Sequence, residues 1–299
     1  MKANISIDFE GEEQYFRTLG VSPEGRLSDN FYSRCAERFL EIFERVGVKA
    51  TFFIVGQDVD ENLDTLRQIV KAGHQIGNHS HDHQFAMSRY DVEEQNDDIQ
   101  RAHEKIKSAL DVEARCYRAP CYDVSYPNIE FLHSLGYQCD SSFYPSNLAY
   151  FQRLFLKAYT NRPVSMGPTD VHRYPGRPFL LDVSASPPVV SDRANGTTLL
   201  EVPIPYFSPL QLPLYSTPQF ALGKGFVVRG VRSLLRRQIP FTYELHSLDV
   251  ACETTDGIDP ALRRIPQMRV GLQKKTSDFE EIFTIMKNEA DIVPITDLA

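Results

Sequence analysis

Short apolar runs alternate with amphipathic helical patterns along the first half of the chain. Residues 4–9 (NISIDF) predict a strand, and residues 29–46 predict a helix with Asp29 as its N-cap. Further strands are predicted at 49–55, 74–80, 115–120 and 138–142, and further helices at 60–72, 91–110 and 129–135. Strands that alternate with helices in this way are typical of βα units around a parallel sheet.

The pattern changes between residues 163 and 218, where 11 of the 19 prolines lie. Proline removes a backbone donor and fixes φ, so this stretch is predicted to be mostly irregular, with two strand candidates at 179–183 and 198–204. Regular patterns return with a helix at 218–237, a strand at 241–246, a helix at 277–288 and a strand at 291–295. We therefore expect one α/β domain over 1–299, a closed or partly closed (β/α) barrel of about seven units with an irregular proline-rich insertion at about 160–218.

Composition narrows the function classes. A content of 42% hydrophobic and 24% charged residues is ordinary for a globular chain. The 32 Lys and Arg against 40 Asp and Glu give a net charge of −8, which argues against nucleic acid or an anionic membrane as partner. With no long apolar segment and no secretory signal pattern, we expect a cytoplasmic protein without a transmembrane segment. The 5 cysteines form no CxxC pair and are expected to be reduced thiols.

Ionisable residues recur where predicted strands end, which is where barrels of this kind carry their chemistry. The first strand ends in Asp8-Phe9-Glu10, and because side chains at i and i+2 share a face, both carboxylates can point into one cavity. Taken alone, the same pair is also expected of a solvated strand end. The strand at 241–246 ends in His246, and an arginine, Arg118, stands two residues before Pro120.

The third strand ends in a cluster that contains 3 of the 8 histidines of the chain, within residues 79–83. Imidazole is a preferred zinc ligand, and two histidines with one carboxylate leave a coordination position open. An extended backbone would place His79, His81 and His83 on one face, whereas a helical turn would pair His79 with His83; we favour the turn, because a helix follows. A surface histidine cluster without metal is the alternative.

Together these motifs resemble the polysaccharide deacetylases of the NodB-homology type, carbohydrate esterase family 4. The resemblance rests on Asp8-x-Glu10, His79-Ser80-x-x-His83, Arg118-Ala119-Pro120, Asp140-Ser141-Ser142 and Leu245-His246. It implies a distorted (β/α)7 barrel, a divalent metal ion (commonly zinc, with cobalt or nickel as alternatives) and hydrolysis of an acetyl group on a sugar.

By position, the resemblance implies Glu10, His79 and His83 as metal ligands, Asp8 as general base, Arg118 as its orienting partner and His246 as general acid. Cys121, Tyr122 and Asp140 are expected to bind substrate. The first motif departs from the adjacent aspartates common in the family, so the roles of Asp8 and Glu10 could be exchanged. Cys121 also departs from the family pattern and could line the pocket or bind the metal.

The expected substrate is an acetylated sugar: an oligosaccharide, or a nucleotide-linked or lipid-linked intermediate of cell-surface polysaccharide (lipopolysaccharide, O-antigen or capsule) synthesis. The 14 tyrosines give modest support for a sugar substrate, because aromatic faces stack on sugar rings, and the absence of tryptophan argues against a long open groove of Trp platforms for a polymer. Arg162, Arg173 and Arg177 of the insertion are expected to meet a phosphate. A deformylase or cyclic-ureide hydrolase, a catalytically silent sugar-binding barrel, and a structural subunit of a glycan-assembly complex are the alternatives. Self-association as a homo-oligomer is also compatible with the sequence.

Overall fold

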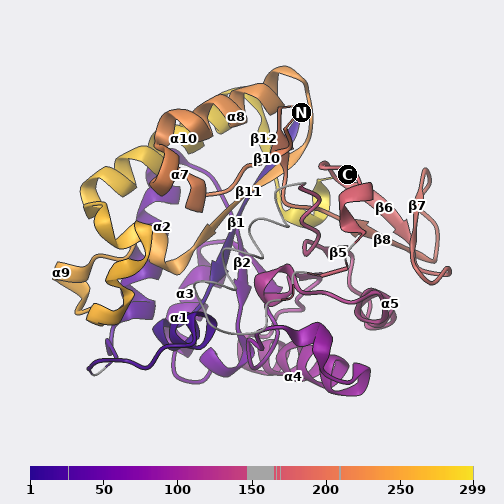
Figure 1. Ribbon diagram of the computed structural model, residues 1–299, viewed down its shortest axis with the longest axis horizontal. Coiled ribbons are helices and arrows are strands. Elements are labelled where there is room, and N and C mark those ends of the chain that lie inside the picture. Colours follow the sequence, from indigo (N-terminus) through magenta and orange to yellow (C-terminus); the bar gives the residue numbers. More distant parts are fainter. Residues whose placement is uncertain (26, 147–164, 166, 169, 209, 299) are drawn as a thin grey trace.

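The architecture is a twisted parallel sheet that curls into a partly closed barrel (Figure 1). The computed structural model describes residues 1–299 except 26, 147–164, 166, 169, 209 and 299. Among the described residues, neighbouring parallel strands run in the order β11-β1-β2-β3-β4-β5-β8. Their bounds are β1 Lys2–Phe9, β2 Thr51–Ile54, β3 Gln75–Asn78, β4 Cys116–Tyr117, β5 Cys139–Asp140, β8 Thr198–Glu201 and β11 Phe241–His246. This confirms the expected distorted (β/α)7 barrel.

Short strands complete the sheet. β6 (Phe179–Asp182) and β7 (Val189–Ser191) extend its β8 edge in antiparallel fashion. β9 (Tyr206–Phe207) and β10 (Leu212–Pro213) form a separate ribbon, and β12 (Asp291–Ile292) pairs with the start of β1. The described part of the 160–218 segment is therefore more regular than we expected, and it supplies a barrel strand, β8. The many prolines led us to expect less regular structure than there is, but most of them lie between the short strands and not within them.

Helices cover the outside of the sheet. They are α1 Glu12–Leu19, α2 Phe31–Val46, α3 Leu63–Lys71, α4 Val92–Leu110, α5 Tyr126–Ser134, α7 Thr217–Leu222, α8 Lys224–Arg236, α9 Glu253–Asp256 and α10 Leu272–Glu289. Helices α8, α10, α2, α3, α4 and α5 contact one another in that order around the sheet.

Several predicted helix boundaries were wrong. The helices expected at 129–135 and 277–288 begin earlier, at Tyr126 and Leu272. The helix expected from Asp29 begins at Phe31, so Asp29 lies outside its cap. The single helix expected at 218–237 is divided into α7 and α8 by Gly223, whose φ of 85° lies outside the helical region.

β1 divides its side chains between two environments. Ile5, Ile7 and Phe9 belong to the apolar core, and the Phe9 ring packs on Tyr32 and Phe52. The alternate positions carry Asn4, Ser6 and Asp8, which are also buried, and polar partners from adjacent strands satisfy them. The Ser6 hydroxyl lies 2.9 Å from the Thr242 hydroxyl, and Thr242 donates to Asn4 Oδ1 at 2.9 Å. A polar column thus runs along the barrel interior toward the ends of the strands, where the candidate site lies.

Candidate active site

Asp8 and Glu10 share one face at the end of β1, as the i, i+2 spacing predicts. Both are buried, with exposed fractions of 4% and 6%. The backbone around Glu10 is fixed from two sides: its N–H donates to Ser247 Oγ at 2.9 Å, and the next N–H, of Gly11, donates to Asp58 Oδ2 at 2.8 Å. The strand end therefore presents both carboxylates in a set orientation rather than as a solvated terminus.

A tight loop after β3 positions the histidines. Ser80 and His83 have φ values of 64° and 49°, so the chain makes a left-handed turn here instead of the helical turn we expected. Local hydrogen bonds hold this conformation: the Ser80 N–H donates to Asn78 Oδ1 at 2.8 Å, and the His83 N–H donates to Ser80 Oγ at 3.1 Å. The turn brings His79 and His83 together, with ring centroids 5.0 Å apart.

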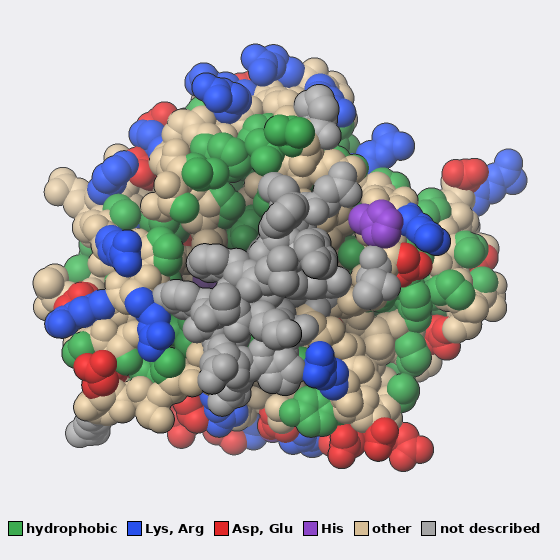
Figure 2. Space-filling model, in the orientation of Figure 1, with side chains coloured by type: hydrophobic (Ala, Val, Ile, Leu, Met, Phe, Trp, Pro, Cys, Tyr) green, Lys and Arg blue, Asp and Glu red, His purple; other side chains and the backbone are tan. Residues whose placement is uncertain are grey.

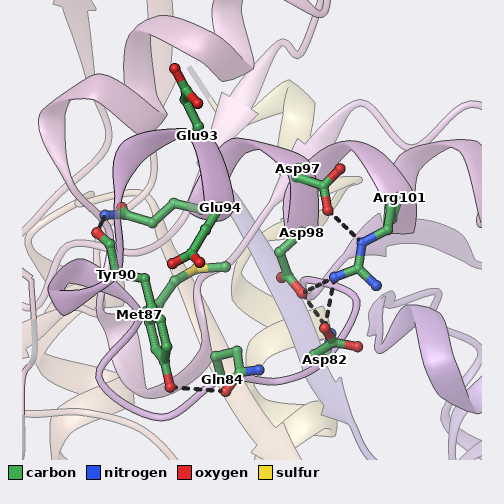
Figure 3. Close-up of a pocket in the computed structure, with 10 residues that line it drawn as sticks. Asp82, Gln84, Met87, Tyr90, Glu93, Glu94, Asp97, Asp98 and Arg101 are labelled. Atoms are coloured by element: carbon green, nitrogen blue, oxygen red, sulfur yellow. Dashed lines mark hydrogen bonds and ion pairs between the residues drawn. The ribbon is translucent and has the colours of Figure 1, made fainter.

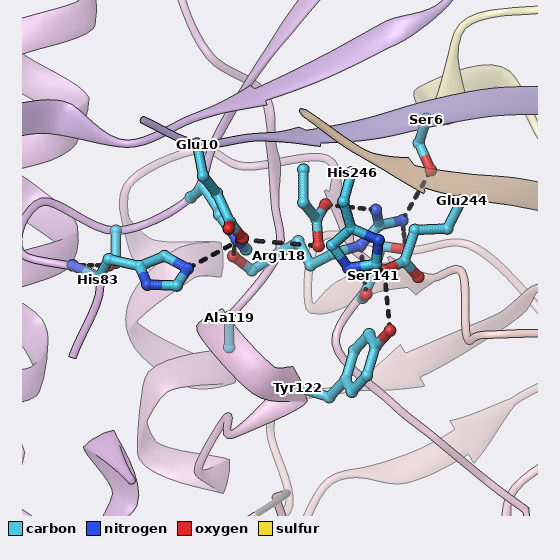
Figure 4. Close-up of polar contacts among 12 residues, drawn as sticks. Ser6, Glu10, His83, Arg118, Ala119, Tyr122, Ser141, Glu244 and His246 are labelled. Atoms are coloured by element: carbon cyan, nitrogen blue, oxygen red, sulfur yellow. Dashed lines mark hydrogen bonds and ion pairs between the residues drawn. The ribbon is translucent and has the colours of Figure 1, made fainter. Parts of the chain in front are cut away.

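Glu10, His79 and His83 converge on one point, and Figure 4 shows His83 pointing toward Glu10. Glu10 Oε1 lies 3.4 Å from His79 Nε2 and 3.1 Å from His83 Nε2, and all three donor atoms lie within 4.8 Å of one another. His79 Nδ1 lies 2.7 Å from the carbonyl oxygen of Arg118, an acceptor, so Nδ1 carries hydrogen and, in the neutral ring, Nε2 offers a lone pair toward Glu10.

The donor set fits a divalent metal ion. In the neutral tautomer, His79 Nε2 and the Glu10 carboxylate are both acceptors, and they face each other where little water can reach. A cation between them satisfies these atoms and leaves coordination positions open. His81 is not part of the group; Asp98 accepts the N–H groups of His81 and Asp82 at 3.0 and 2.8 Å and so supports the loop.

The electrostatics of the cluster agree with this fit. Burial raises the pKa of Glu10, but His83 and His79 outweigh it and hold the pKa well below its usual range. Burial lowers the pKa of His79, but Asp8 and Glu10 outweigh it and raise the pKa above its ordinary value. Without a metal ion, positive charge is thus drawn onto the His79 imidazole beside Glu10.

Arg118 anchors the second carboxylate. It is fully buried, and its Nη1 donates to Asp8 Oδ1 at 2.7 Å. Its other donors reach Ser6 Oγ at 3.0 Å, and Ser141 Oγ and the Ser141 carbonyl at 2.8 and 3.1 Å. Burial raises the pKa of Asp8, but Arg118 and then His79 outweigh it, so the pKa of Asp8 lies below its ordinary value. Asp8 is therefore an ionised, oriented carboxylate.

Glu244, which the sequence reasoning missed, lies beside His246. It is fully buried on β11, and its Oε1 lies 3.5 Å from His246 Nε2 and accepts a hydrogen bond from Tyr122 OH at 2.8 Å (Figure 4). Burial raises the pKa of Glu244 to about 7, although Arg118 opposes the shift. Its position two residues before a strand-terminal histidine was the signal that could have found it.

A pocket of about 490 Å³ opens onto these groups. Asp8, Glu10, His83 and His246 line it, together with Cys121 and Tyr122 from the expected substrate-binding set. Asp140 does not line it, contrary to our expectation: its side chain is fully buried behind Arg118 and accepts from Ser142 Oγ at 2.6 Å. Ser142 in turn accepts the N–H of Ala119 at 2.9 Å, so Asp140 supports the loop that carries Cys121 and Tyr122.

The arginines that line the pocket are Arg264 and Arg269, both exposed residues of the C-terminal part of the chain. Arg173 and Arg177 of the insertion do not line it, and Arg162 lies outside the described residues. The expectation that the insertion supplies arginines to the pocket is therefore not met by Arg173 and Arg177. Apolar side chains, including Leu19, Leu248 and Ile265, form much of the remaining wall.

A second pocket, of about 450 Å³, lies on α4 and lacks this chemistry. Acidic side chains gather along the lower edge of the molecule, where α4 runs (Figure 2), and Asp82, Glu94 and Asp98 line the pocket (Figure 3). Arg101 is engaged with Asp82 at 2.6 Å and Asp97 at 2.8 Å. Asp98, which lines this pocket, accepts hydrogen bonds from the loop that carries His79 and His83. This residue therefore supports the active site from outside.

Comparison with known proteins adds independent findings. Residues 28–139 match the family model described as polysaccharide deacetylase, a stretch that contains His79, His83 and Arg118. The chain is 33% identical over 84 residues to the uncharacterised protein YlxY of Bacillus subtilis, which is 28% of this chain and 26% of that protein. It is 29% identical over 107 residues to a peptidoglycan deacetylase of Helicobacter pylori, which is 35% of this chain and 36% of that protein. The matches thus span about a quarter to a third of these relatives.

The fold has a counterpart that spans nearly the whole chain. The crystal structure of a putative polysaccharide deacetylase from Mycobacterium smegmatis matches with a TM-score of 0.61 at 16% identity, over 97% of this chain and 85% of that one. At this identity the likeness concerns the fold. Among the described residues, the helices are all too short or too polar to cross a membrane.

Proposed function

Because the chain belongs to the polysaccharide deacetylase family, through its residues 28–139, we propose that it is a metal-dependent hydrolase that removes the acetyl group from an acetamido sugar. The observation that carries the proposal is the convergence of Glu10, His79 and His83, within 4.8 Å, beside Asp8 and His246 in one pocket. When bound there, a divalent ion, most simply zinc (with cobalt or nickel as alternatives), supplies a Lewis acid that activates water and polarises the acetyl carbonyl.

The side chains divide the remaining work. Asp8, held ionised by Arg118 at 2.7 Å, accepts a proton from the attacking water. Arg118 orients Asp8 and stays charged throughout: burial lowers its pKa, but the carboxylates of Asp8 and Glu244 outweigh burial and raise the pKa above its ordinary value. His246, whose side chain is 21% exposed toward the pocket, donates a proton to the departing amine. Glu10 serves as the carboxylate ligand, because it lies 3.4 and 3.1 Å from the two imidazoles, whereas Asp8 contacts the guanidinium at 2.7 Å and, of these two imidazoles, lies near His79 alone, at 3.8 Å.

The pocket lining favours a small substrate that carries an anionic group. Beyond the catalytic groups, the charged side chains that line the pocket among the described residues are Arg264 and Arg269, although the whole chain has a net charge of −8. Arginine suits phosphate and carboxylate recognition. We therefore favour an acetamido sugar attached to phosphate, as in nucleotide-linked or lipid-linked intermediates of cell-surface polysaccharide synthesis. A cytoplasmic location stays a prediction.

The test is a panel of substrates assayed in parallel for released acetate, formate and ammonia. We expect acetate from N-acetylglucosamine 1-phosphate at a higher kcat/KM than from the neutral methyl glycoside, with Asp8→Asn as the inactive control. Formate from a formamido sugar, or ammonia from a cyclic ureide, without acetate would favour the related amide hydrolases. Binding of the sugars without any turnover by the metal-loaded protein would favour a silent sugar-binding barrel.

A further inference from the structure

Glu244 has no part in the roles assigned so far, yet it lies beside both groups that are assigned to proton transfer, Asp8 and His246. Donor atoms of Asp8, Glu244 and His246 all lie within 4.8 Å of one another. Glu244 and His246 stand at i and i+2 of β11, so their side chains lie on the same face of the strand. The Glu244 side chain is fully buried, while His246 reaches the pocket.

The contacts of Glu244 are directional. Tyr122 OH donates to Oε1 at 2.8 Å, and the same oxygen lies 3.5 Å from His246 Nε2. Figure 4 shows Tyr122 and His246 both pointing toward Glu244. The hydrogen bond from Tyr122 fixes the orientation of the Glu244 carboxylate. The carboxylate in turn faces Nε2 of the His246 ring and so orients that ring. Burying a carboxylate is costly because it loses its hydration, and the hydrogen bond from Tyr122 offsets part of that cost for Glu244.

The charge around the pair favours a protonated imidazole. The groups that face His246 are Glu244 on its own strand, Asp249 in the following turn, and Asp8 and Glu10 at the end of β1. Burial lowers the pKa of His246, but Glu244, the largest of the opposing charges, and then Asp249 raise it above its ordinary value. Glu244 itself faces Arg118, Asp8, His246 and Tyr122.

We propose that Glu244 is a positioning residue of the acid half of the site: with Tyr122 it orients His246 and stabilises the imidazolium that protonates the departing amine. This inference rests on the proposed function. In the step concerned, the C–N bond breaks, its electron pair stays on nitrogen, and nitrogen takes the proton of His246. The imidazolium becomes neutral imidazole, and Glu244 remains a carboxylate acceptor for Tyr122. Glu244 does not touch the substrate.

The decisive variant is Glu244→Gln, which keeps the shape of the side chain and an oxygen for Tyr122 but removes the charge. We expect the pKa of His246, followed by NMR, to fall in the variant. With zinc bound, we expect kcat to fall by about 10–100-fold with KM nearly unchanged, and the loss of activity at high pH to begin at lower pH. Glu244→Asp should recover part of the kcat.

A matched control separates this effect from the cost of altering any buried glutamate. Glu201 on β8 is also fully buried and accepts the Phe143 N–H at 3.0 Å, and it lies outside the pocket. Glu201→Gln should leave the His246 titration and the pH profile unchanged.

Two results would overturn the inference. One is an unchanged His246 titration and pH profile in Glu244→Gln; the other is a loss of bound metal in that variant, which would make Glu244 a ligand. The NMR titration needs no substrate. A wild-type protein without turnover would therefore refute the proposed function, while the NMR titration would still test whether Glu244 stabilises the imidazolium of His246.

Discussion

Two clusters of carboxylate and imidazole lie side by side at the ends of the barrel strands, and their composition is nearly the same. Glu10, His79 and His83 form one; Asp8, Glu244 and His246 form the other. In both, the donor atoms lie within 4.8 Å, so distance and residue type alone make both look like metal sites.

The difference is Arg118. Its guanidinium contacts Asp8 at 2.7 Å and faces Glu244, so the second cluster already holds a permanent cation. No lysine or arginine among the described residues forms an ion pair with Glu10; its partners are the two imidazoles, at 3.4 and 3.1 Å. We therefore expect the charge beside a cluster to decide whether it binds a metal ion or transfers protons.

The largest effect should come from removing one histidine of each cluster. His79→Ala should lose bound metal and nearly all turnover. His246→Ala should keep the metal while turnover falls by about 10²–10⁴-fold, because only general acid catalysis is removed. Metal content by mass spectrometry, beside kcat for both variants, checks this. A His79→Ala protein with full metal content, or an empty His246→Ala protein, would break the comparison. Glu10→Ala should behave as His79→Ala does, which would settle Glu10 as the ligand rather than Asp8.

The next largest effect, on stability, should come from removing the guanidinium of Arg118. Arg118→Met leaves Asp8 buried without its cation, and we expect the free energy of unfolding to fall by about 3–5 kcal/mol. Arg17→Met is the surface control: Arg17 pairs with Glu13 at 2.7 Å, but their side chains are 43% and 55% exposed, so the loss should stay below about 1 kcal/mol. Urea titrations of both single variants give the two losses of stability. The double variant Asp8→Asn/Arg118→Met shows how much of the loss for Arg118→Met comes from leaving Asp8 without its partner. Equal losses for Arg118 and Arg17 would contradict the role of Arg118.

The predictability of the two clusters differs for physical reasons. The sequence could place Asp8 and Glu10 on one face, because strand periodicity is local, and the spacing of His79 and His83 marked them as a pair. It could not show the left-handed turn, because Ser80 and His83 are not glycines, and their positive φ values depend on hydrogen bonds that their N–H groups donate to the side chains of Asn78 and Ser80. Glu244 stands two residues before His246, a spacing that places both side chains on one face of the strand, but the sequence alone does not show that its carboxylate is buried.

The fold shows the same limit. The parallel strands were predictable from short apolar runs between helical patterns. Within the proline-rich stretch, the strand candidates at 179–183 and 198–204 correspond to β6 and β8. The short strand β7 was not predicted; it pairs with β6 at the edge of the sheet. Asp140 was misassigned for a related reason: it follows a strand as the site residues do, but its partners Ser142 and Glu201 turn it away from the pocket.

A histidine outside both clusters, His74, shows how burial and a neighbouring charge make stability depend on pH. His74 is 7% exposed and faces Lys49, and its Nδ1 accepts the Ala50 N–H at 3.0 Å. Burial, and then Lys49, lower its pKa from 6.5 to about 4. The folded state therefore binds this proton less readily than the unfolded chain does. Its contribution to stability is complete above pH 6.5 and is lost as the pH falls toward about 4, by about 3 kcal/mol in total.

The variant His74→Asn keeps an acceptor for Ala50 and removes the titration. Urea unfolding of both proteins across this pH range should show a shallower loss of stability for His74→Asn. Parallel curves would mean that burial beside Lys49 does not govern His74.

The smallest effect concerns Cys121, which lines the pocket and was a candidate ligand. Burial, and then Glu10, raise the pKa of this thiol, which disfavours the thiolate form that binds metal ions. Cys121→Ser should keep its metal, with kcat changed by no more than about threefold. The cobalt-loaded wild type should lack a thiolate-to-cobalt absorption band. Cys252 is the reactivity control, because its pKa is lowered to about 7 by nearby Thr254 and Thr255 even though burial opposes the shift. An alkylating reagent at neutral pH should therefore modify Cys252 before Cys121. A cobalt–thiolate band that disappears in Cys121→Ser would instead add a thiolate to the first cluster, and the division between the clusters would then need a sulfur ligand as well as a neighbouring charge.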